Sequence, residues 1–217
     1  NHIKFKNALV QTIQELNNLS IRSALNSGTD VLGRFYEIFI KYANWAQDLG
    51  IVLTPRHVTK FAAEVENIGP KDIVLDVTCG TGGFLVAAFD YVKKGSNPNQ
   101  IQEFKENGLF GIEQDAGIVS LAIVNMIFRG DGRNNIVEGN CFSKFLAPLT
   151  RNGVASASFV TSQSNKPPVT KVLMNPPFAL KSSSEKEYKF VNHALNQMSD
   201  GGTLFSILPS SVMVKGG

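Results

Sequence analysis

The sequence lacks long apolar runs. No stretch of its 217 residues approaches the roughly 18 to 20 uninterrupted apolar residues that a membrane helix needs, and the first residues do not open a signal peptide. The sequence therefore predicts no membrane partner and a cytoplasmic address. Charged residues are also few, at 18%, beside 43% hydrophobic residues, which excludes a disordered tail and predicts an ordinary globular chain.

Cysteine and histidine are scarce as well. Cys79 and Cys141 cannot form a disulfide framework, and neither lies at metal-binding spacing, so no metal site is expected. Both are expected to be small buried residues rather than nucleophiles. The three histidines, His2, His57 and His193, are expected to be structural or solvated. The net charge of +3 is too small by itself to indicate a nucleic-acid binder.

The first 68 residues have the pattern of helices. Apolar residues recur at three- and four-residue spacings within residues 5–26 and 31–48, which is typical of amphipathic helices. Thr54 and Pro55 predict the start of a third helix, with threonine as N-cap and proline at the first helical position. Its expected buried stripe is Val58, Phe61, Ala62 and Val65. Residues 1–68 are therefore expected to form a helical N-terminal region.

From residue 69 the pattern changes to alternating strands and helices. Short β-rich runs are predicted at residues 73–77, 109–113, 135–138, 171–174 and 203–208. Helical segments are predicted between most of them, at residues 83–92, 116–128 and 187–198. This order predicts an α/β fold with a doubly wound, mostly parallel sheet. Residues 93–108 and 155–171 interrupt the order and are expected to be surface insertions.

The first predicted strand ends in an acidic residue followed by a glycine cluster, in Asp76-Val77-Thr78-Cys79-Gly80-Thr81-Gly82-Gly83. Glycines let a ligand approach the backbone, and the helix that follows offers free N–H groups, so this turn is a candidate site for a nucleotide-like ligand. The turn lacks the Gly-Lys-Ser/Thr of phosphate-binding loops and the later glycine of the dinucleotide fingerprint, which disfavours an ATPase or a dehydrogenase. A purely structural turn remains an alternative.

Two further candidates follow later strands. Glu113 ends the second predicted strand, where a carboxylate can accept ribose hydroxyls, although a solvated strand end is the alternative. Asn175-Pro176-Pro177-Phe178 directly follows the fourth strand. Its two prolines remove backbone donors and leave carbonyls without local N–H competitors, while Phe178 offers a flat face for a planar ring. The alternative is an ordinary Asn-Pro turn.

Together these three motifs resemble, in residue type and order, the S-adenosylmethionine-dependent amino methyltransferases. The segments Asp30-Val31-Leu32-Gly33-Arg34-Phe35-Tyr36-Glu37 and Leu53-Thr54-Pro55-Arg56-His57-Val58 narrow the resemblance to the modification subunits of type I restriction-modification systems. These are adenine-specific DNA methyltransferases, and the resemblance covers about residues 30–217. It implies that residues 69–217 form a Rossmann-like catalytic domain that is truncated at its C-terminus.

The resemblance also implies a cofactor and a set of residues that bind it. S-adenosylmethionine would be held at its methionine part by Asp76, Gly80 and Gly82, and at its ribose by Glu113. Thr54 would contact the methionine part from the helical side. Asn140 stands where the family usually has the aspartate that binds the cofactor's adenine, and the remaining cofactor-binding positions are Pro55, Thr78 and Asn175.

The expected reaction is methylation of the exocyclic amino group of a flipped-out adenine in DNA. The catalytic set is Asn175, Pro176, Pro177 and Phe178. The side-chain oxygen of Asn175 and the carbonyl of Pro176 would accept the two amino hydrogens, and Phe178 would stack on the ring. Placement of a neutral nucleophile matters more here than a strong base.

Partners and alternatives complete the expectations. The sequence contains no recognisable DNA-reading element. The resemblance implies DNA as a partner, together with a specificity subunit that chooses the site and a restriction subunit. A methyltransferase acting on protein glutamine or on RNA is the closest alternative. A cofactor-binding but inactive assembly module is another. The chain starts without Met, so a fragment is expected.

Overall fold

The computed structural model describes residues 53–128, 135–178, 186–210 and 212, which all belong to one compact unit, Val52–Gly217. The helices expected within residues 1–52, together with His2, lie outside the described residues. The domain boundary expected at residue 68 stays a prediction.

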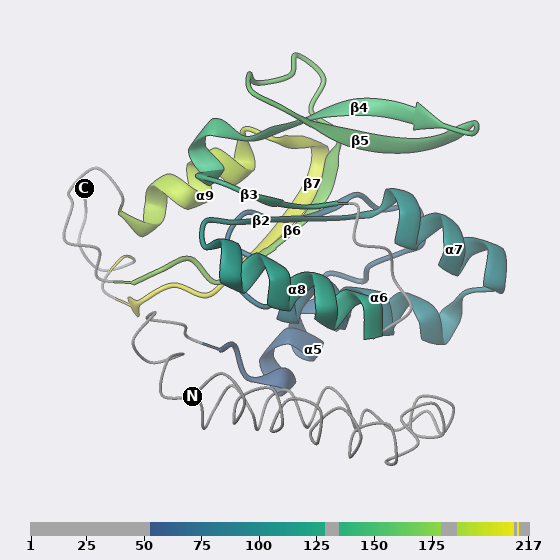
Figure 1. Cartoon of the computed structure of the whole chain (residues 1–217), viewed down its shortest axis with the longest axis horizontal. Coiled ribbons are helices and arrows are strands. Elements are labelled where there is room, and N and C mark those ends of the chain that lie inside the picture. Colours follow the sequence, from purple (N-terminus) through teal and green to yellow (C-terminus); the bar gives the residue numbers. More distant parts are fainter. Residues whose placement is uncertain (1–52, 129–134, 179–185, 211, 213–217) are drawn as a thin grey trace, which may run out of the picture. The chain divides into compact units, whose positions relative to one another are not determined.

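A five-stranded sheet forms the centre of this unit (Figure 1). Its strand order is β3-β2-β1-β6-β7, and every neighbouring pair is parallel. The strands are β1 (Val74–Asp76), β2 (Leu109–Glu113), β3 (Ile136–Glu138), β6 (Val169–Met174) and β7 (Met198–Ser206). The predicted doubly wound parallel sheet is confirmed. The strand order reverses between β1 and β6, the place where open α/β sheets bind ligands.

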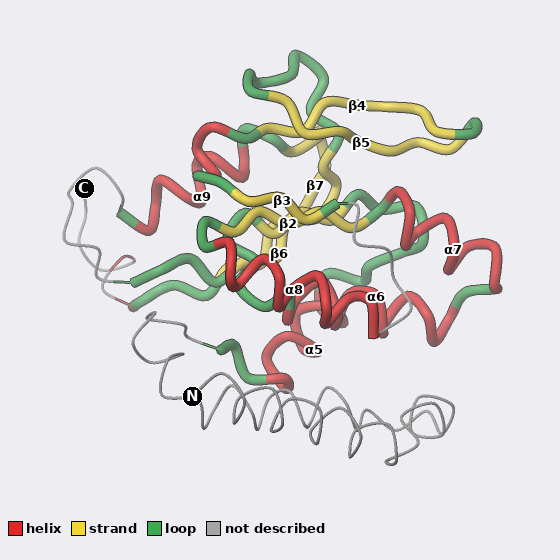
Figure 2. The backbone as a smooth tube through the Cα atoms, in the orientation of Figure 1, coloured by secondary structure: helices red, strands yellow, loops and turns green. Residues whose placement is uncertain are grey.

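Helices cover one face of the sheet, and a hairpin with one helix covers the other (Figures 1 and 2). The first layer contains α5 (Arg56–Val65), α6 (Gly83–Gly95) and α8 (Ala116–Phe128). The second contains α9 (Glu187–Leu195) and the antiparallel strands β4 (Phe145–Arg151) and β5 (Val154–Val160). Because strand side chains alternate between faces, Val74 and Leu173 join the first core, and Leu75 and Val172 join the second.

Two details of α5 differ from the sequence prediction. The helix begins one residue later, with Pro55 at the N-cap position and no side-chain cap bond from Thr54. Its buried face is also different, because Thr59, Ala62 and Ala63 are buried while Phe61 and Val65 are 56% and 57% exposed. Small side chains let α5 approach α6 closely, and a Cβ added at Gly83 would lie 3.8 Å from the Thr59 methyl carbon. Close helix approach, which needs small side chains, therefore selects the buried face rather than hydrophobicity.

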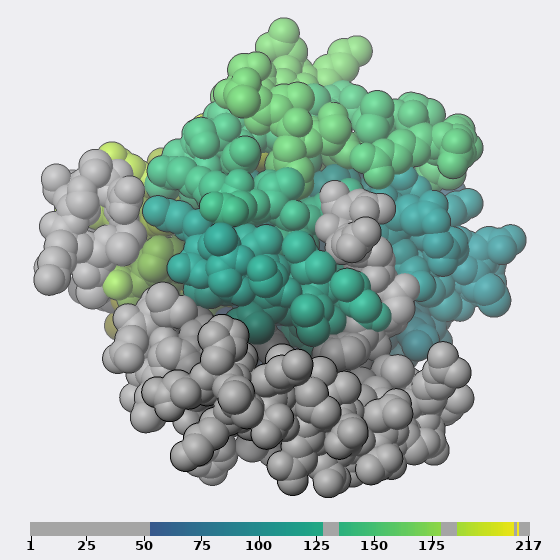
Figure 3. All heavy atoms as spheres, in the orientation of Figure 1, coloured from purple at the N-terminus to yellow at the C-terminus, as the bar shows by residue number. Residues whose placement is uncertain are grey.

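The two expected surface insertions contain regular structure. Residues 98–107 form α7 (Pro98–Asn107), which starts with a capping box between Asn97 and Gln100. The prediction for residues 155–171 was wrong in part, because β5 pairs with β4 and its Ala157 is fully buried. On the face shown in Figure 3, the surface of this hairpin lies above that of α8. The hairpin contributes Leu146 and Ala157 to the core on the second face of the sheet, a face that the doubly wound prediction assigned to helices.

The boundaries of two other elements differ from the sequence prediction. The helix predicted at residues 187–198 ends at Leu195, and the last strand starts at Met198 rather than at residue 203. No helix in the described part of the chain is long and apolar enough to cross a membrane.

Candidate functional site

Three candidate residues end or directly follow neighbouring strands and face the same side of the sheet. Asp76, Glu113 and Asn175 lie at the carboxyl ends of β1, β2 and β6. Each is an even number of residues from a side chain in the helix-side core, namely Val74, Leu109 and Leu173. Since strand side chains alternate with period two, all three project toward the α5–α6 layer.

The turn after β1 has the backbone that its glycines predict. Gly80 and Gly82 have φ values of 53° and 81°, and Gly82 is the N-cap residue of α6. The Thr78 N–H donates to Asp76 Oδ1 at 3.0 Å, and the Gly82 N–H donates to the Cys79 carbonyl at 2.8 Å. A Cβ added at Gly80 would meet nothing within 4 Å, so the turn has an open side there. The turn is therefore rigid and exposes backbone to a ligand.

Glu113 joins the second strand to this turn. Its Oε2 accepts from the Gly80 N–H at 3.0 Å. Its Oε1 accepts from the N–H groups of Gln114 and Asp115 at 2.7 and 3.0 Å. A carboxylate has about four acceptor positions, so about one remains for a ligand hydroxyl in this arrangement. The sequence suggested acceptance of both ribose hydroxyls but gave no sign of these backbone bonds.

Asp76 lies in an unusual electrostatic environment. Burial raises the pKa of its carboxyl to about 8; the Thr78 N–H opposes this effect and the nearby Glu113 charge adds to it. Burial also raises the pKa of Cys79 well above its ordinary value, with further contributions from Asp76 and Glu113. Cys79 and Cys141 are free and buried, as the sequence predicted. A neutral, buried thiol is a packing group and not a nucleophile.

Asn175, which follows β6, is hydrogen-bonded to the start of the described chain. Asn175 Nδ2 donates to Thr54 Oγ1 at 3.1 Å, although the two residues are 121 positions apart. Asn175 Oδ1 is buried and has no hydrogen-bond partner among the described residues. Pro176 is buried, Pro177 is exposed, and Phe178 is 41% exposed. An oriented amide oxygen and an accessible aromatic ring therefore follow β6.

The remaining predicted residues lie around this edge. Asn140 follows β3 and is exposed; its Oδ1 accepts from the Phe142 N–H at 2.9 Å and caps a short 3₁₀ turn. Its neighbour Gly139 donates to the Glu113 carbonyl at 2.9 Å, which ties this loop to the end of β2. Pro55 is exposed before α5, and the Thr78 hydroxyl oxygen is buried without a partner among the described residues. Buried orphan oxygens at both Thr78 and Asn175 fit a polar ligand, because such atoms are costly to leave unpaired.

One residue at this site was missed by the sequence analysis. Asn125 on α8 donates from Nδ2 to the Thr81 carbonyl at 3.0 Å, inside the glycine turn. Ala122, one helical turn earlier, is the nearest residue to a Cβ added at Gly82, at 3.7 Å. The available signal was a lone amide in an otherwise largely apolar helical segment.

His193 is buried, and it belongs to the packing between α9 and the hairpin. Its ring nitrogen Nε2 lies 3.2 Å from the Lys144 carbonyl and 2.9 Å from Gln197 Nε2, and burial lowers its pKa. It is structural, as expected. No group of three or more His, Cys, Asp or Glu side chains in the described ranges could hold a metal ion.

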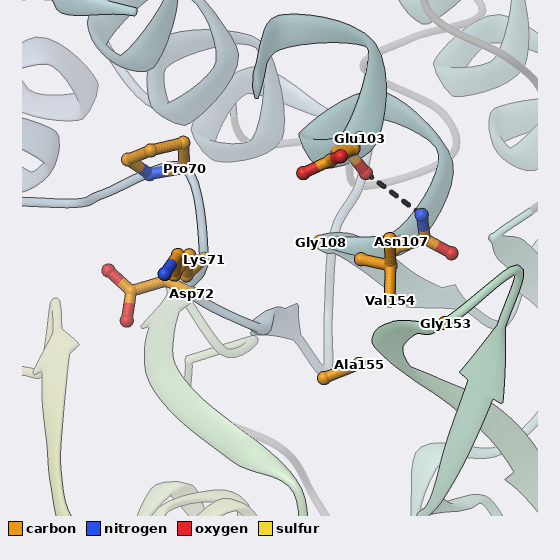
Figure 4. Close-up of a pocket in the computed structure, with 9 residues that line it drawn as sticks. All are labelled: Pro70, Lys71, Asp72, Glu103, Asn107, Gly108, Gly153, Val154 and Ala155. Carbon is orange, nitrogen blue, oxygen red and sulfur yellow. Dashed lines mark hydrogen bonds between the residues drawn. The ribbon is translucent and has the colours of Figure 1, made fainter. Parts of the chain in front are cut away.

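A hollow of about 280 Å³ lies at the opposite edge of the sheet (Figure 4). It is lined by the turn before β1, the end of α7 and the tip of the hairpin, including Asp72, Asn107 and Gly153. Asn107 Nδ2 donates to the Glu103 carbonyl at 3.1 Å, the bond drawn in Figure 4. Asp72 and Gly108 precede β1 and β2, so this hollow is at the amino ends of the strands, away from Asp76 and Glu113.

The fold and the residues at its carboxyl edge define a Rossmann-like α/β protein, with a ligand-type glycine turn after the first strand and an acidic residue after the second. The chain belongs to the N-6 DNA Methylase family, whose sequence profile matches residues 27–217.

Named relatives agree with this family. The Type II restriction enzyme and methyltransferase RM.BcgI of Heyndrickxia coagulans is 37% identical over 195 residues, covering 87% of this chain and 28% of that protein. The Type I restriction enzyme EcoEI methylase subunit of Escherichia coli is 32% identical over 133 residues, covering 60% of this chain and 26% of that subunit. The chain therefore spans little more than a quarter of either relative.

Solved structures share the fold. The Type I restriction enzyme EcoKI M protein aligns with a TM-score of 0.57 at 25% identity, covering 76% of this chain and 35% of that one. A structure solved in work on complex assembly and conformational transition of the type I R-M system aligns with a TM-score of 0.68 at 22% identity, covering 87% of this chain and 38% of that one.

Proposed function

We propose that this chain is the catalytic part of an adenine-specific DNA methyltransferase that uses S-adenosylmethionine. The observation that carries the proposal is the buried Asn175 Oδ1, which has no partner among the described residues, together with an exposed Phe178 after β6. A hydrogen-bond acceptor next to a flat ring suits an aromatic amine. Membership in the N-6 DNA Methylase family supports adenine as that amine.

The turn after β1 and the end of β2 are proposed to bind the cofactor. Gly80 and Gly82 allow close approach, and Asp76 with Thr78 offers polar atoms for the methionine part. Glu113 would accept from a ribose hydroxyl, and Asn140, after β3, would contact the adenine ring of the cofactor. Pro55 and Thr54 would close the site from the side of α5. When bound, S-adenosylmethionine supplies an electrophilic methyl group on a sulfonium.

Asn175, Pro176 and Phe178 are proposed to prepare the nucleophile. The lone pair of an adenine amino group is delocalised into its ring, which makes the nitrogen a weak nucleophile. Asn175 Oδ1 and the Pro176 carbonyl would accept its two hydrogens and concentrate electron density on the nitrogen. Pro177 keeps the segment rigid and removes a competing N–H, and Phe178 stacks on the flipped base. A fixed near-attack geometry, and no strong base, is what this arrangement provides.

The assembly around the chain is also a proposal. Several curated relatives are methylase subunits of type I restriction enzymes, which supports DNA, a specificity subunit and a restriction subunit as partners. The second candidate is a single chain that joins restriction and methylation, because RM.BcgI has the higher identity, 37%. Either protein would act in the cytoplasm, where its DNA is.

The test is the transfer of labelled methyl groups from S-adenosylmethionine to unmodified DNA, followed by nucleoside analysis. The protein is assayed in the longest form in which the chain occurs, with and without any co-encoded specificity subunit. Label in N6-methyladenine supports the proposal, and dependence on the second subunit separates the two assemblies. Label in protein or RNA would contradict the proposal and support one of those acceptors instead. Cofactor binding without any transfer would support an inactive assembly module.

Asn175→Ala is the matching variant. It removes the amide oxygen, so methyl transfer to DNA is expected to fall by at least about a hundredfold, while binding of S-adenosylmethionine stays within a few-fold of wild type. Equilibrium binding and single-turnover transfer measure the two effects separately. Full activity in this variant would remove Asn175 from the mechanism.

A further inference from the structure

Thr54 has a hydrogen bond that its place in the sequence does not predict. It precedes α5, where threonine normally caps the helix, yet no side chain caps α5. Its Oγ1 instead accepts from Asn175 Nδ2 at 3.1 Å. The threonine hydroxyl is therefore directed to the amide at the end of β6.

The bond to Thr54 uses the NH₂ end of the Asn175 amide. An asparagine side chain has one acceptor oxygen and one NH₂ donor group on opposite sides of the same carbon. With Nδ2 on Thr54, the end that remains is Oδ1, and Oδ1 is the atom that is buried without a partner among the described residues. The amide turned by 180° would present NH₂ instead.

We propose that Thr54 is a positioning residue that holds the Asn175 amide with Oδ1 toward the methyl acceptor. This inference rests on the proposed function, because the acceptor is an amine that needs hydrogen-bond acceptors. A turned amide would set the NH₂ of Asn175 against the amino group of the substrate, so two donors would meet and the nitrogen would not be activated.

The same hydroxyl remains able to contact the cofactor. A threonine hydroxyl has one proton to donate and two lone pairs, and the bond from Asn175 uses one lone pair. Its proton would go to a carboxylate of the methionine part, the contact that Thr54 was expected to make. With the proton used there, the hydroxyl can only accept, so it pairs with Nδ2 of Asn175 and not with Oδ1, and this fixes the orientation of the amide. The two roles differ in kinetics: a cofactor contact affects KM for S-adenosylmethionine, whereas orientation of the amide affects kcat.

The experiment compares Thr54→Val, which keeps the shape but removes the hydroxyl, with Thr54→Ser, which keeps the hydroxyl. At saturating S-adenosylmethionine, Thr54→Val is expected to lower kcat for DNA methylation by about tenfold or more, and Thr54→Ser by less than about threefold. Thr150→Val, the same change at an exposed position of β4, is the control and should leave kcat unchanged. All variants are assayed in the longest form of the protein with any specificity subunit present.

Asn175→Asp provides a second, independent test. A carboxylate has two equivalent oxygens and thus no wrong orientation, so Thr54→Val should change kcat by less than about threefold in the Asn175→Asp background. An equal loss of kcat in both backgrounds would overturn the proposal. So would a rise in KM for S-adenosylmethionine with unchanged kcat, or a Thr54→Ser variant as impaired as Thr54→Val.

A failure of this proposal can be distinguished from a failure of the proposed function. Thermal unfolding and S-adenosylmethionine binding first show whether each variant is folded. If the wild-type protein methylates no adenine under any condition, the proposed function fails, and Thr54 is not the cause. If wild type is active and the Thr54 variants behave like Thr150→Val, only the role of Thr54 is wrong.

Discussion

Asp76 illustrates what burial does to a single residue at this site. Its carboxyl is buried at the end of β1, and its pKa is raised to about 8, mainly because desolvation disfavours the charged form. Without a bound cation, most Asp76 side chains are therefore protonated at neutral pH. The proposed cofactor carries an ammonium group and a sulfonium, and a positive charge beside Asp76 would favour its ionised form.

This shift predicts a pH dependence of stability in the cofactor-free protein. The folded-state pKa of Asp76 lies above the unfolded value of 3.8. The contribution of its protonated carboxyl to the free energy of unfolding is therefore fully present below about pH 4 and is lost as pH rises toward 8. Asp76→Asn removes this loss. Relative to wild type, the free energy of unfolding of the variant should increase from pH 4 to pH 8, by on the order of a few kcal/mol. Urea denaturation at several pH values measures it.

The control for this prediction is Asp200→Asn, the same change at an exposed position of β7. Its unfolding curve should follow that of wild type across the pH range. If the Asp76→Asn and wild-type free energies differ by a constant amount from pH 4 to pH 8, Asp76 does not titrate there and the argument from burial is wrong.

At the scale of elements, α8 acts as the outer support of the glycine turn. Gly80 and Gly82 both have positive φ values, and flexible glycines on either side of Thr81 need something to hold the backbone between them. Asn125 provides this by donating to the Thr81 carbonyl, while Glu113 holds the Gly80 N–H from the other side. The turn is thus fixed by two elements that neighbour it only in the folded protein.

Asn125→Leu should therefore weaken cofactor binding. Leucine has nearly the same shape as asparagine but cannot donate to Thr81, so the turn loses one hydrogen bond worth about 1 kcal/mol. The Kd for S-adenosylmethionine should rise by about fivefold or more, with kcat at saturating cofactor within about twofold of wild type. Isothermal titration calorimetry and steady-state kinetics measure these quantities.

Ser120→Ala, at an exposed position of the same helix, is the comparison for Asn125→Leu. It should leave the cofactor Kd unchanged. An Asn125→Leu protein that binds S-adenosylmethionine as tightly as wild type would mean that the turn needs no support from α8.

At the scale of the whole described unit, Gln197 connects three separate elements. It is 1% exposed and lies between the end of α9 and the start of β7. Its Oε1 accepts from the Leu146 N–H of β4 at 2.9 Å, and its Nε2 lies 2.9 Å from the His193 ring nitrogen. The hairpin is thereby attached to the rest of the second layer through buried polar contacts.

Replacing Gln197 by Met should destabilise the protein without affecting the site. The Leu146 N–H would lose its acceptor inside the core, which costs about 1 to 3 kcal/mol in the free energy of unfolding. The cofactor Kd should not change. Gln102→Met, on the exposed side of α7, is the matched control and should leave stability near that of wild type in the same denaturant titration.

Local patterns explain which parts of this structure were predictable. The five parallel strands and the helices between them follow from β-rich runs, helical periodicity and glycine turns, all of which are short-range features. The same holds for Asp76, Glu113 and Asn175, because a residue that ends a parallel strand lies at the carboxyl edge wherever the strand packs. The α7 capping box of Asn97 and Gln100 was also visible locally, although an insertion was expected there.

Other features depended on partners far away in the chain. The buried face of α5 could not be inferred from hydrophobicity, because close packing on α6 favours Ala62 and Ala63 over Phe61. The hairpin was missed because the sheet face that it covers exists only after the strands assemble.

By itself, the sequence determined the strand and helix order, the candidate residues at the carboxyl edge and the family to which the chain belongs, because these are encoded in short segments. Only the tertiary structure decided that Thr54 meets Asn175, that Glu113 holds Gly80 and that Asn125 supports Thr81. Those bonds join segments 33 to 121 residues apart. Which side chains meet over such separations depends on how whole elements pack, and no local pattern records it.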